Sequence, residues 1–157
     1  MGLIGAGLVI GIGGTVAMDL WAWLLARLAG VPMPNWGRVG RWVAQLPRGR
    51  VFHTDIGAVA PVSGETALGW VFHYAVGAVY GVIFALIAGP GWFAAPSFLP
   101  VWIFALVVIA GGWFLLHPGM GLGWALSKTE APAKGRFLGL VAHTVFGLGM
   151  YAAALTL

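Results

Sequence analysis

The sequence predicts an all-α, polytopic membrane protein with four transmembrane helices. Of its 157 residues, 61% are hydrophobic and only 8% are charged. A soluble domain of this length has no core large enough to hide so much apolar surface, so lipid must cover most of it. Four apolar stretches are also long enough to cross a hydrocarbon core about 30 Å thick, which takes roughly 20 helical residues. They lack the alternation of a membrane β-barrel, and we expect a single membrane domain over residues 1–157.

The first predicted helix covers residues 3–29 and is closed by Pro32 and Pro34. Proline cannot continue a helix, because it lacks the backbone N–H and its ring clashes with the preceding turn. The start of this stretch has no basic flank and its apolar run exceeds twenty residues, so we expect it to be kept as a membrane anchor.

The loop that follows, residues 30–65, contains an amphipathic segment. Its apolar residues fall on one helical arc of about 120° at 100° per residue; they are Trp36, Val39, Trp42, Val43 and Leu46. Its polar residues take the opposite arc; they are Arg38, Arg41, Gln45 and Arg48. We predict an interfacial helix with its tryptophans in the acyl boundary and its arginines on anionic lipid headgroups. The alternative is a basic loop that is ordered only by packing on the helix ends.

Three further transmembrane helices are predicted over residues 66–88, 98–117 and 135–156. Gly89-Pro90-Gly91 closes the second helix, whereas His117-Pro118-Gly119 either interrupts or ends the third. Glu65 stands where an acidic residue favours a helix N-terminus.

The distribution of charge predicts the topology. The first loop contains Arg38, Arg41, Arg48 and Arg50, and the third contains or borders Lys128, Lys134 and Arg136. The short loop over residues 89–97 has no charge. By the positive-inside rule, both basic loops are cytoplasmic and both termini are periplasmic. The net charge of +4 comes from only eight basic residues, which is too sparse for a nucleic-acid partner.

Glycine stripes organise the helix faces. Residues at i, i+4 positions lie above one another on a helix, and three helices carry small and ionisable residues at this spacing. The stripes are Gly7, Gly11, Thr15 and Asp19; Gly69, His73, Gly77 and Gly81; and Gly139, His143, Gly147 and Tyr151. Small residues let membrane helices approach closely. Each ionisable residue on these stripes should therefore face other helices instead of lipid.

Depth places the ionisable residues at a common level. At about 1.5 Å per residue, Asp19 lies roughly 15 Å, His73 about 10 Å and His143 about 12 Å from the cytoplasmic end of its helix. His117 joins this level if the third helix continues, kinked, past Pro118. We therefore predict a ligand site made by Asp19, His73 and His143, with Thr15, Tyr74 and Tyr80 beside them.

Three chemistries are compatible with this set. Asp19, His73, His117 and His143 could bind zinc or another divalent metal, for which carboxylate and imidazole suffice. Two histidines could instead be the axial ligands of a haem, or the group could relay protons. The sequence has no cysteine, which excludes thiolate sites, and it contains no zinc-binding His-Glu-x-x-His, phosphate loop or nucleophile elbow.

A purely structural role is the competing interpretation of each residue. A charged carboxylate in a bilayer costs roughly 2.5 to 3.5 kcal/mol on insertion scales, so Asp19 should be paired, hydrated or protonated. A membrane histidine can simply bridge to a carbonyl or to a hydroxyl such as that of Thr15 or Thr144. His117 could satisfy a carbonyl that Pro118 leaves free.

The chain also resembles itself. His73-x-x-x-Gly77 corresponds to His143-x-x-x-Gly147, and the spacing from Gly14 to Asp19 equals that from Gly112 to His117. This pattern predicts two pseudo-repeated helix pairs related by an axis along the membrane normal.

Several segments resemble a family of uncharacterised bacterial inner-membrane proteins, domain of unknown function 2938. The segments are Gly13-Gly14-Thr15-Val16-Ala17-Met18-Asp19, Gly40-Arg41-Trp42, Pro47-Arg48-Gly49-Arg50 with His53, Gly64-Glu65, and Gly69-Trp70 with His73-Tyr74. The resemblance covers essentially the whole chain and implies a small multi-helix membrane protein. It brings no established activity or ligand.

These observations lead to one main functional hypothesis and two rivals. The main hypothesis is an inner-membrane protein that binds or transports a small solute or ion at the Asp/His site, with a homodimer enclosing the pathway because four helices leave little room. One rival is a membrane metalloenzyme or haem enzyme that uses the same residues as ligands. The other is a non-catalytic accessory subunit whose polar stripe only packs against another membrane protein.

Overall fold

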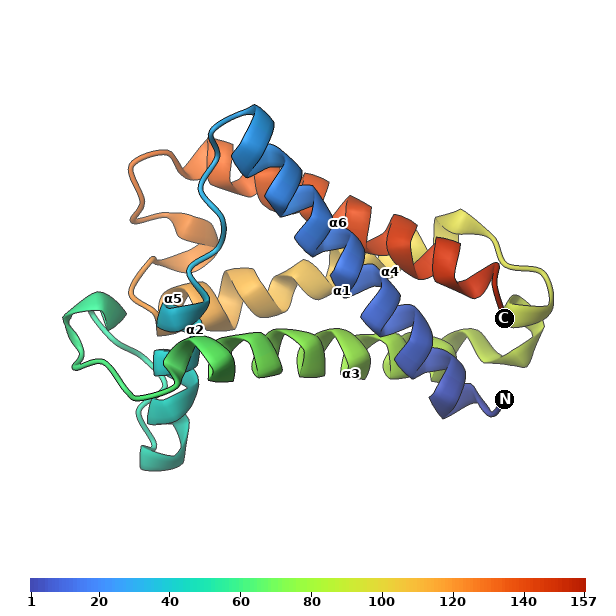
Figure 1. Cartoon of the computed structure of the whole chain (residues 1–157), viewed down its shortest axis with the longest axis horizontal. Helices are drawn as coiled ribbons and strands as arrows, with labels where there is room; N and C mark the ends of the chain where they lie inside the picture. The colour runs from blue at the N-terminus through green and yellow to red at the C-terminus, as the bar shows by residue number, and fades with distance from the viewer. The chain divides into compact units, whose positions relative to one another are not determined.

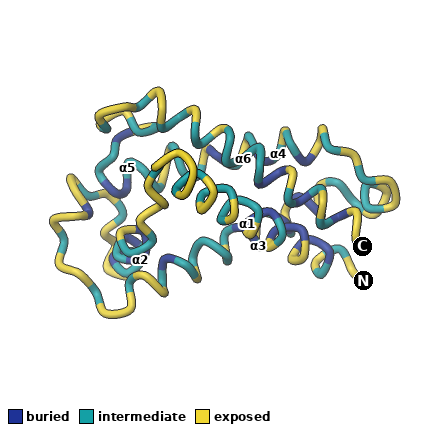
Figure 2. The backbone as a smooth tube through the Cα atoms, turned by 45° about the horizontal axis from the view of Figure 1, so that its top comes forward, coloured by how far each residue is buried: buried dark blue, intermediate teal, exposed yellow.

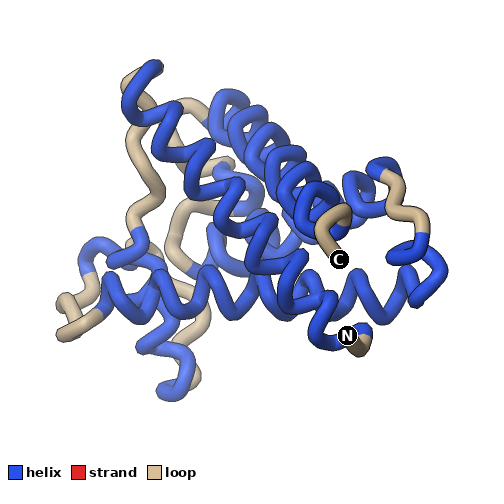
Figure 3. The backbone as a smooth tube through the Cα atoms, turned by 45° about the vertical axis from the view of Figure 1, so that its right-hand side comes forward, coloured by secondary structure: helices blue, strands red, loops and turns tan.

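A computed structural model describes residues 1–157, and every regular element in it is helical (Figure 3). Four helices are long and apolar enough to cross a membrane; they are Leu3–Leu28, Glu65–Ala94, Phe98–Gly119 and Pro132–Ala154. These match the four predicted spans. The remaining helical elements are short: α2 (Trp36–Gln45) and the 3-10 turns η1 (Leu46–Arg48), η2 (Ile56–Ala58) and η4 (Trp124–Leu126).

The first two long helices follow the predicted boundaries closely. Helix α1 spans Leu3–Leu28. Helix α3 spans Glu65–Ala94, but Gly89 leaves the helical conformation with φ 70° and ψ 177°. Glycine tolerates this positive φ, which other residues rarely adopt. The regular part of α3 therefore ends where Gly89-Pro90-Gly91 predicted, and a short helical segment follows it.

The third span is a composite of three elements. Helix α4 (Phe98–Gly111) leads into a π-helical segment, η3 (Gly112–Leu116), and then into α5 (His117–Gly119). Within the π segment, the His117 backbone N–H donates to the Gly112 carbonyl, one residue further back than in an α-helix. Pro118 follows directly and lacks an N–H of its own. The span ends beside this proline, so the optional continuation towards Ser127 does not occur.

The last span begins three residues earlier than predicted. Helix α6 covers Pro132–Ala154, and Pro132 opens it because proline is favoured at the first helical position, where an N–H would be unpaired anyway.

The chain divides into two compact units. Unit 1 comprises Met1–Met33, Tyr74–Val108 and Leu140–Leu157, and unit 2 comprises Pro34–His73 and Ile109–Gly139. Helices α3 and α6 contribute residues to both units.

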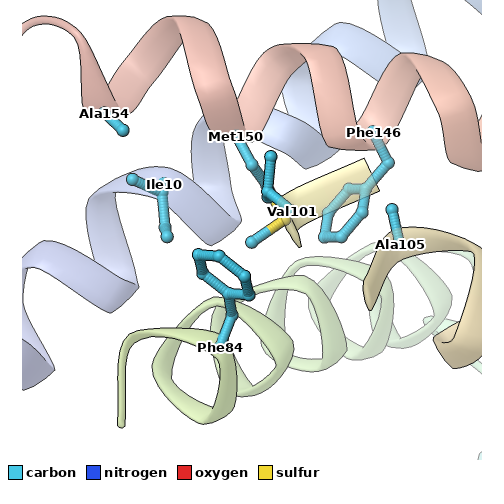
Figure 4. Packing of buried hydrophobic residues seen from close by; sticks show 7 residues of the cluster. All are labelled: Ile10, Phe84, Val101, Ala105, Phe146, Met150 and Ala154. Carbon is cyan, nitrogen blue, oxygen red and sulfur yellow. The ribbon is translucent and has the colours of Figure 1, made fainter. Parts of the chain in front are cut away.

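The core of unit 1 draws on α1, α3, α4 and α6. The side chains of Figure 4 point towards one another from these helices; they are Ile10, Phe84, Val101, Ala105, Phe146, Met150 and Ala154. Ile10, Val101, Ala105 and Met150 have no exposed surface at all. This cluster holds the four helices of unit 1 together.

Glycines set the close contacts in unit 1. A Cβ on Gly7 would meet the backbone of Gly81 and Val82, and one on Gly11 would meet the Gly77 carbonyl. Helix α1 also contacts α6, because a Cβ on Gly149 would meet the backbone of Gly13. Backbone contact of this kind requires residues without side chains and increases the dispersion attraction between helices.

Most of the apolar surface of the long helices remains uncovered by protein. No more than a third (33%) of the most apolar window of any span is buried, and the burial colouring shows exposed residues along α1, α3 and α6 (Figure 2). Large apolar side chains point outwards; Ile87 is 73% and Val107 64% exposed. Exposed apolar surface on this scale identifies a multi-pass membrane protein.

Both termini of unit 1 lie at the same end as the connection between α3 and α4 (Figures 1 and 3). This connection is the uncharged short loop of the sequence. The arrangement agrees with an even number of membrane crossings.

Unit 2 joins the two basic loops of the sequence. The His53 backbone N–H donates to the Gly119 carbonyl at 3.0 Å, and the Ile56 N–H donates to the Met120 carbonyl at 3.1 Å. A small core lies beneath these bonds; its buried members are Val39, Trp42, Ile56 and Met120. The two loops therefore lie on one side, as their shared charge predicted.

Helix α2 crosses the first turns of α3 with backbone contact. A Cβ on Gly40 would collide with the Glu65 carbonyl, and a Cβ on Gly69 would collide with the Trp36 carbonyl. Neither position can hold a larger residue unless the helices separate.

Candidate functional site

The polar centre of unit 1 is a hydrogen bond between two spanning helices. The Tyr74 hydroxyl on α3 donates to Oδ2 of Asp19 on α1 at 2.8 Å. Both side chains are half-buried. Asp19 and Tyr74 were both predicted as ligand residues, and the structure brings these two together. The hydrogen bond links α1 to α3 through polar side chains within unit 1.

Thr15 has a different role from the one predicted. Its side chain is 1% exposed, and its hydroxyl donates to the Gly11 carbonyl at 2.9 Å within α1. The same hydroxyl lies against the backbone of Gly77, where a Cβ would collide with it. Because threonine back-bonding and packing use the whole side chain, Thr15 has no surface to offer a ligand in this structure.

Tyr80 also belongs to packing. Its ring is perpendicular to that of Phe104, with centroids 6.4 Å apart, and it borders the core of unit 1. A second polar contact that the sequence did not reveal lies elsewhere in this unit, where the Trp102 indole N–H donates to the Thr144 hydroxyl at 3.1 Å. The Thr144 hydroxyl, which the sequence analysis offered as one possible partner of a membrane histidine, thus accepts a hydrogen bond from a tryptophan.

His73 is the last residue of unit 2 and forms part of an aromatic cluster. Its imidazole stacks on the Trp36 indole with centroids 4.1 Å apart and an interplanar angle of 28°. Trp70 meets Trp36 at 5.2 Å and His73 at 6.1 Å. Tyr74, the next residue along α3, is the hydrogen-bond partner of Asp19 in unit 1.

The other two predicted histidines fall in different units. His143 lies on α6 in unit 1, and His117 begins α5 in unit 2. Within neither unit do three histidine, aspartate or glutamate side chains gather so that they could hold a metal ion. The donor set needed for a closed metal centre is therefore not assembled in either unit, and the metal and haem hypotheses stay predictions.

The predicted lipid ligands of α2 divide into two classes, of which the first is internal. Trp42 is 2% exposed, and its indole N–H donates to the Val51 carbonyl at 2.7 Å. Its ring packs on Phe72 at 5.9 Å. Trp42 is buried because it belongs to the core of unit 2, and its predicted contact with lipid stays a prediction.

Arg41 is internal as well. Its guanidinium forms a two-point ion pair with Glu65, from Nε to Oε2 at 2.8 Å and from Nη2 to Oε1 at 2.7 Å. Its Nη1 donates to the Val59 carbonyl at 2.8 Å, with longer contacts to two further carbonyls of η2. The hydrogen bonds that Arg41 donates to the Glu65 carboxylate raise the pKa of Arg41 above its ordinary value. Arg41 thus fastens the first loop to the start of α3, and its contact with a lipid phosphate stays a prediction.

The second class comprises two exposed arginines and one half-buried tryptophan. Arg38 and Arg48 are exposed, so their predicted contact with headgroups stays open. Trp36 is half-buried in the aromatic cluster with His73 and Trp70. The sequence assigned these residues to two helical arcs, but periodicity alone does not tell a lipid-facing arc from a protein-facing one.

His53 is a connecting residue that the sequence analysis treated only as part of a family resemblance. Its Nδ1 lies 3.0 Å from the Gly119 carbonyl, the same acceptor that its backbone N–H uses. Since the partner is a carbonyl, Nδ1 carries the proton. His53 therefore joins the end of the third span to the first loop.

The comparison with known families settles the relationship of the chain. The family model described as "Protein of unknown function (DUF2938)" matches residues 8–157. The chain belongs to this family. The DUF2938 match runs from the first turns of α1 to the last residue and so includes both units. No curated protein and no solved structure matches the chain.

Proposed function

We propose that this DUF2938 protein resides in the bacterial inner membrane and binds and transfers protons or another small cation at Asp19 and Tyr74. The observation that supports the proposal is the 2.8 Å hydrogen bond from the Tyr74 hydroxyl to Asp19, made between two helices long and apolar enough to span a membrane. An ionisable residue inside a membrane is costly and usually marks a pathway for ions or protons.

The chemistry of the pair supports a reversible proton site. A phenolic hydroxyl stabilises the carboxylate of Asp19 by donation and can turn to accept when the carboxyl is protonated. The Tyr74 hydroxyl could therefore form a hydrogen bond with Asp19 in either protonation state of the carboxyl group. His143, which lies in the same unit as Asp19, is a further group that could pass a proton towards or away from it. A homodimer would supply the enclosing wall that four helices lack.

Proton flux into liposomes tests this function directly. Purified protein is reconstituted into vesicles that contain a trapped pH-sensitive dye, and a potassium gradient with valinomycin supplies the driving potential. We expect acidification faster than in empty vesicles and its loss in Asp19→Asn, which keeps the shape of the side chain but cannot be charged. Tyr74→Phe should slow the flux roughly tenfold, because hydrogen bonds to charged groups contribute about 1.5 to 3 kcal/mol.

The chain supplies a matched control in Tyr80→Phe. This tyrosine lies on the same helix and packs against Phe104, so the loss of its hydroxyl should leave the flux unchanged. Equal flux in the natural protein and in Asp19→Asn would refute the proposal. A Soret band or stoichiometric metal in the purified protein would instead favour the haem or metal enzyme.

A further inference from the structure

A strained turn on the second basic loop presents an exposed tryptophan. The turn η4 joins Trp124 to Leu126, and its Ser127 N–H donates to the Trp124 carbonyl at 3.0 Å. Its two central residues, Ala125 and Leu126, have φ of 46° and 65°. They are the only residues other than glycine with positive φ in the chain.

Two successive positive φ values are the geometry of a type I′ turn, which strongly favours glycine, asparagine or aspartate. In alanine and leucine, steric contacts of the Cβ atom make this conformation unfavourable by about 1 to 3 kcal/mol per residue. Such strain persists only where the surroundings enforce it, and it is a reason to look for a function.

Helix α6 and the loop just before it hold the turn in place. Nε of Arg136 donates to the Ala125 carbonyl at 2.8 Å. The Leu126 carbonyl accepts from both the N–H and the hydroxyl of Thr129, at 3.0 Å and 2.8 Å. The Leu126 side chain packs over Gly135, where a Cβ would come within 2.6 Å of its Cδ1.

The product of this arrangement is an exposed aromatic surface beside basic residues. Trp124 is 66% exposed, and its ring contacts that of Phe114, which is 50% exposed, at 5.6 Å. Phe137, near the start of α6, is 64% exposed. Lys128 and Lys134 are exposed as well. The loop spans only residues 120–131 between two membrane-crossing helices, so it is confined to the membrane surface.

We propose that this surface docks in the headgroup layer of an anionic lipid bilayer, with Trp124 as its anchor. Tryptophan is enriched at this depth because its ring is apolar and its indole N–H remains hydrated. Lysines beside it are attracted to anionic lipids by about 1 kcal/mol each near the surface. The role that the sequence suggested for Trp42 of the first loop thus belongs to Trp124 of the second.

Site-specific labelling tests the proposal, since the chain has no cysteine of its own. Trp124→Cys and, as a control on an exposed position of the first loop, Ala58→Cys are labelled with an environment-sensitive fluorophore. The proteins are reconstituted into vesicles of phosphatidylcholine with phosphatidylglycerol. At position 124 we expect blue-shifted emission, quenching by a lipid with a shallow spin label and protection from iodide; at position 58 we expect iodide quenching.

Two variants connect this readout to the structure. Arg136→Ala in the Trp124→Cys background should release the turn and reduce quenching by the spin-labelled lipid, whereas Arg136→Lys should reduce it less. Vesicles of phosphatidylcholine alone should give weaker lipid quenching. Thermal unfolding of each labelled variant verifies that the fold is kept.

Three outcomes would overturn the docking. Iodide quenching at position 124 equal to that at position 58 would place Trp124 in water. Protection from both quenchers that disappears when the protein is diluted in lipid would show that a second copy covers Trp124. Lipid quenching that is independent of phosphatidylglycerol would show that anionic headgroups do not contribute to the docking.

Discussion

In both units glycines allow helices to pack closely, but the two units differ in how many charged residues they contain. In both, backbone atoms of crossing helices touch at glycines, Gly11 with Gly77 in unit 1 and Gly40 with Glu65 in unit 2. Unit 1 contains one acidic and one basic residue, whereas unit 2 contains the other three acidic and seven basic residues. The entire net charge of +4 therefore belongs to unit 2.

The difference shows how polar groups are stabilised in the two settings. In unit 1 the carboxylate of Asp19 accepts a hydrogen bond from a neutral group, the Tyr74 hydroxyl. In unit 2 the carboxylate of Glu65 has a permanent cation, Arg41, and is fixed in its charged form. A neutral hydrogen-bond partner does not require the carboxylate to stay charged. An ion pair stabilises the charged carboxylate and the contact between the two segments that carry the pair.

The largest effect on the free energy of unfolding is expected at Trp42, which lies in the small core of unit 2. Trp42→Ala removes a buried aromatic side chain and should lower the free energy of unfolding by about 3 to 5 kcal/mol. Trp42→Phe keeps most of the packing and loses only the hydrogen bond to Val51, at about 1 kcal/mol. Thermal unfolding in detergent measures both. Equal losses would mean that the indole packing contributes little.

The next effect concerns helix contact in unit 1. Gly77→Ala places a Cβ against the Thr15 hydroxyl and should destabilise by about 1 to 3 kcal/mol, as overpacking does. Gly91→Ala is the matched control, since a Cβ there meets nothing within 4 Å. If the control is destabilised as much as Gly77→Ala, loss of backbone freedom and not contact between α1 and α3 explains the result.

A smaller effect is expected at the second polar contact of unit 1. Thr144→Val removes the acceptor of the Trp102 indole while keeping the size of the side chain, and should cost about 0.5 to 1.5 kcal/mol. Trp102→Phe combined with Thr144→Val should cost little more than Trp102→Phe alone. Additive losses in this double-mutant cycle would argue against the hydrogen bond.

The smallest effect sharpens the distinction between internal and exposed arginines of unit 2. Arg48 is exposed and makes only a 3.5 Å contact with the Ala44 carbonyl, so Arg48→Ala should change the stability by less than about 0.5 kcal/mol. Arg41→Ala should lower the melting temperature visibly, because it leaves the Glu65 carboxylate and three loop carbonyls without their donor. Arg41→Lys should rescue it only in part, since an ammonium cannot make the two-point pair.

The sequence was sufficient for the architecture because span length and composition are properties of each helix alone. Pro32, Gly89 and Pro118 end or interrupt a helix whatever its tertiary surroundings. The amphipathic arcs of α2 were also readable, but periodicity states only which residues share a face. What that face covers depended on Met120 and Gly119, which are more than seventy residues away in the chain.

The candidate site was predictable in part for the same reason. Asp19 and Tyr74 were both named as candidates from the sequence, but their hydrogen bond is a finding of the structure. The Arg41–Glu65 pair, the bond from Trp102 to Thr144 and the left-handed turn at Ala125 required knowledge of which segments meet. No local signal separated Thr15, whose hydroxyl bonds its own helix, from a threonine that binds a ligand.

The π-helical segment before His117 should allow the third span to lose one residue without a change in the packing of its flanking parts. One residue more than an α-helical turn holds is accommodated between Gly112 and Leu116. Deleting one residue there would restore an ordinary turn and leave the flanking side chains in phase, whereas the same deletion in α4 would rotate everything beyond it by about 100°. The third span should therefore tolerate shortening at this one place, and homologues that lack a residue here would keep the same joint with the first loop.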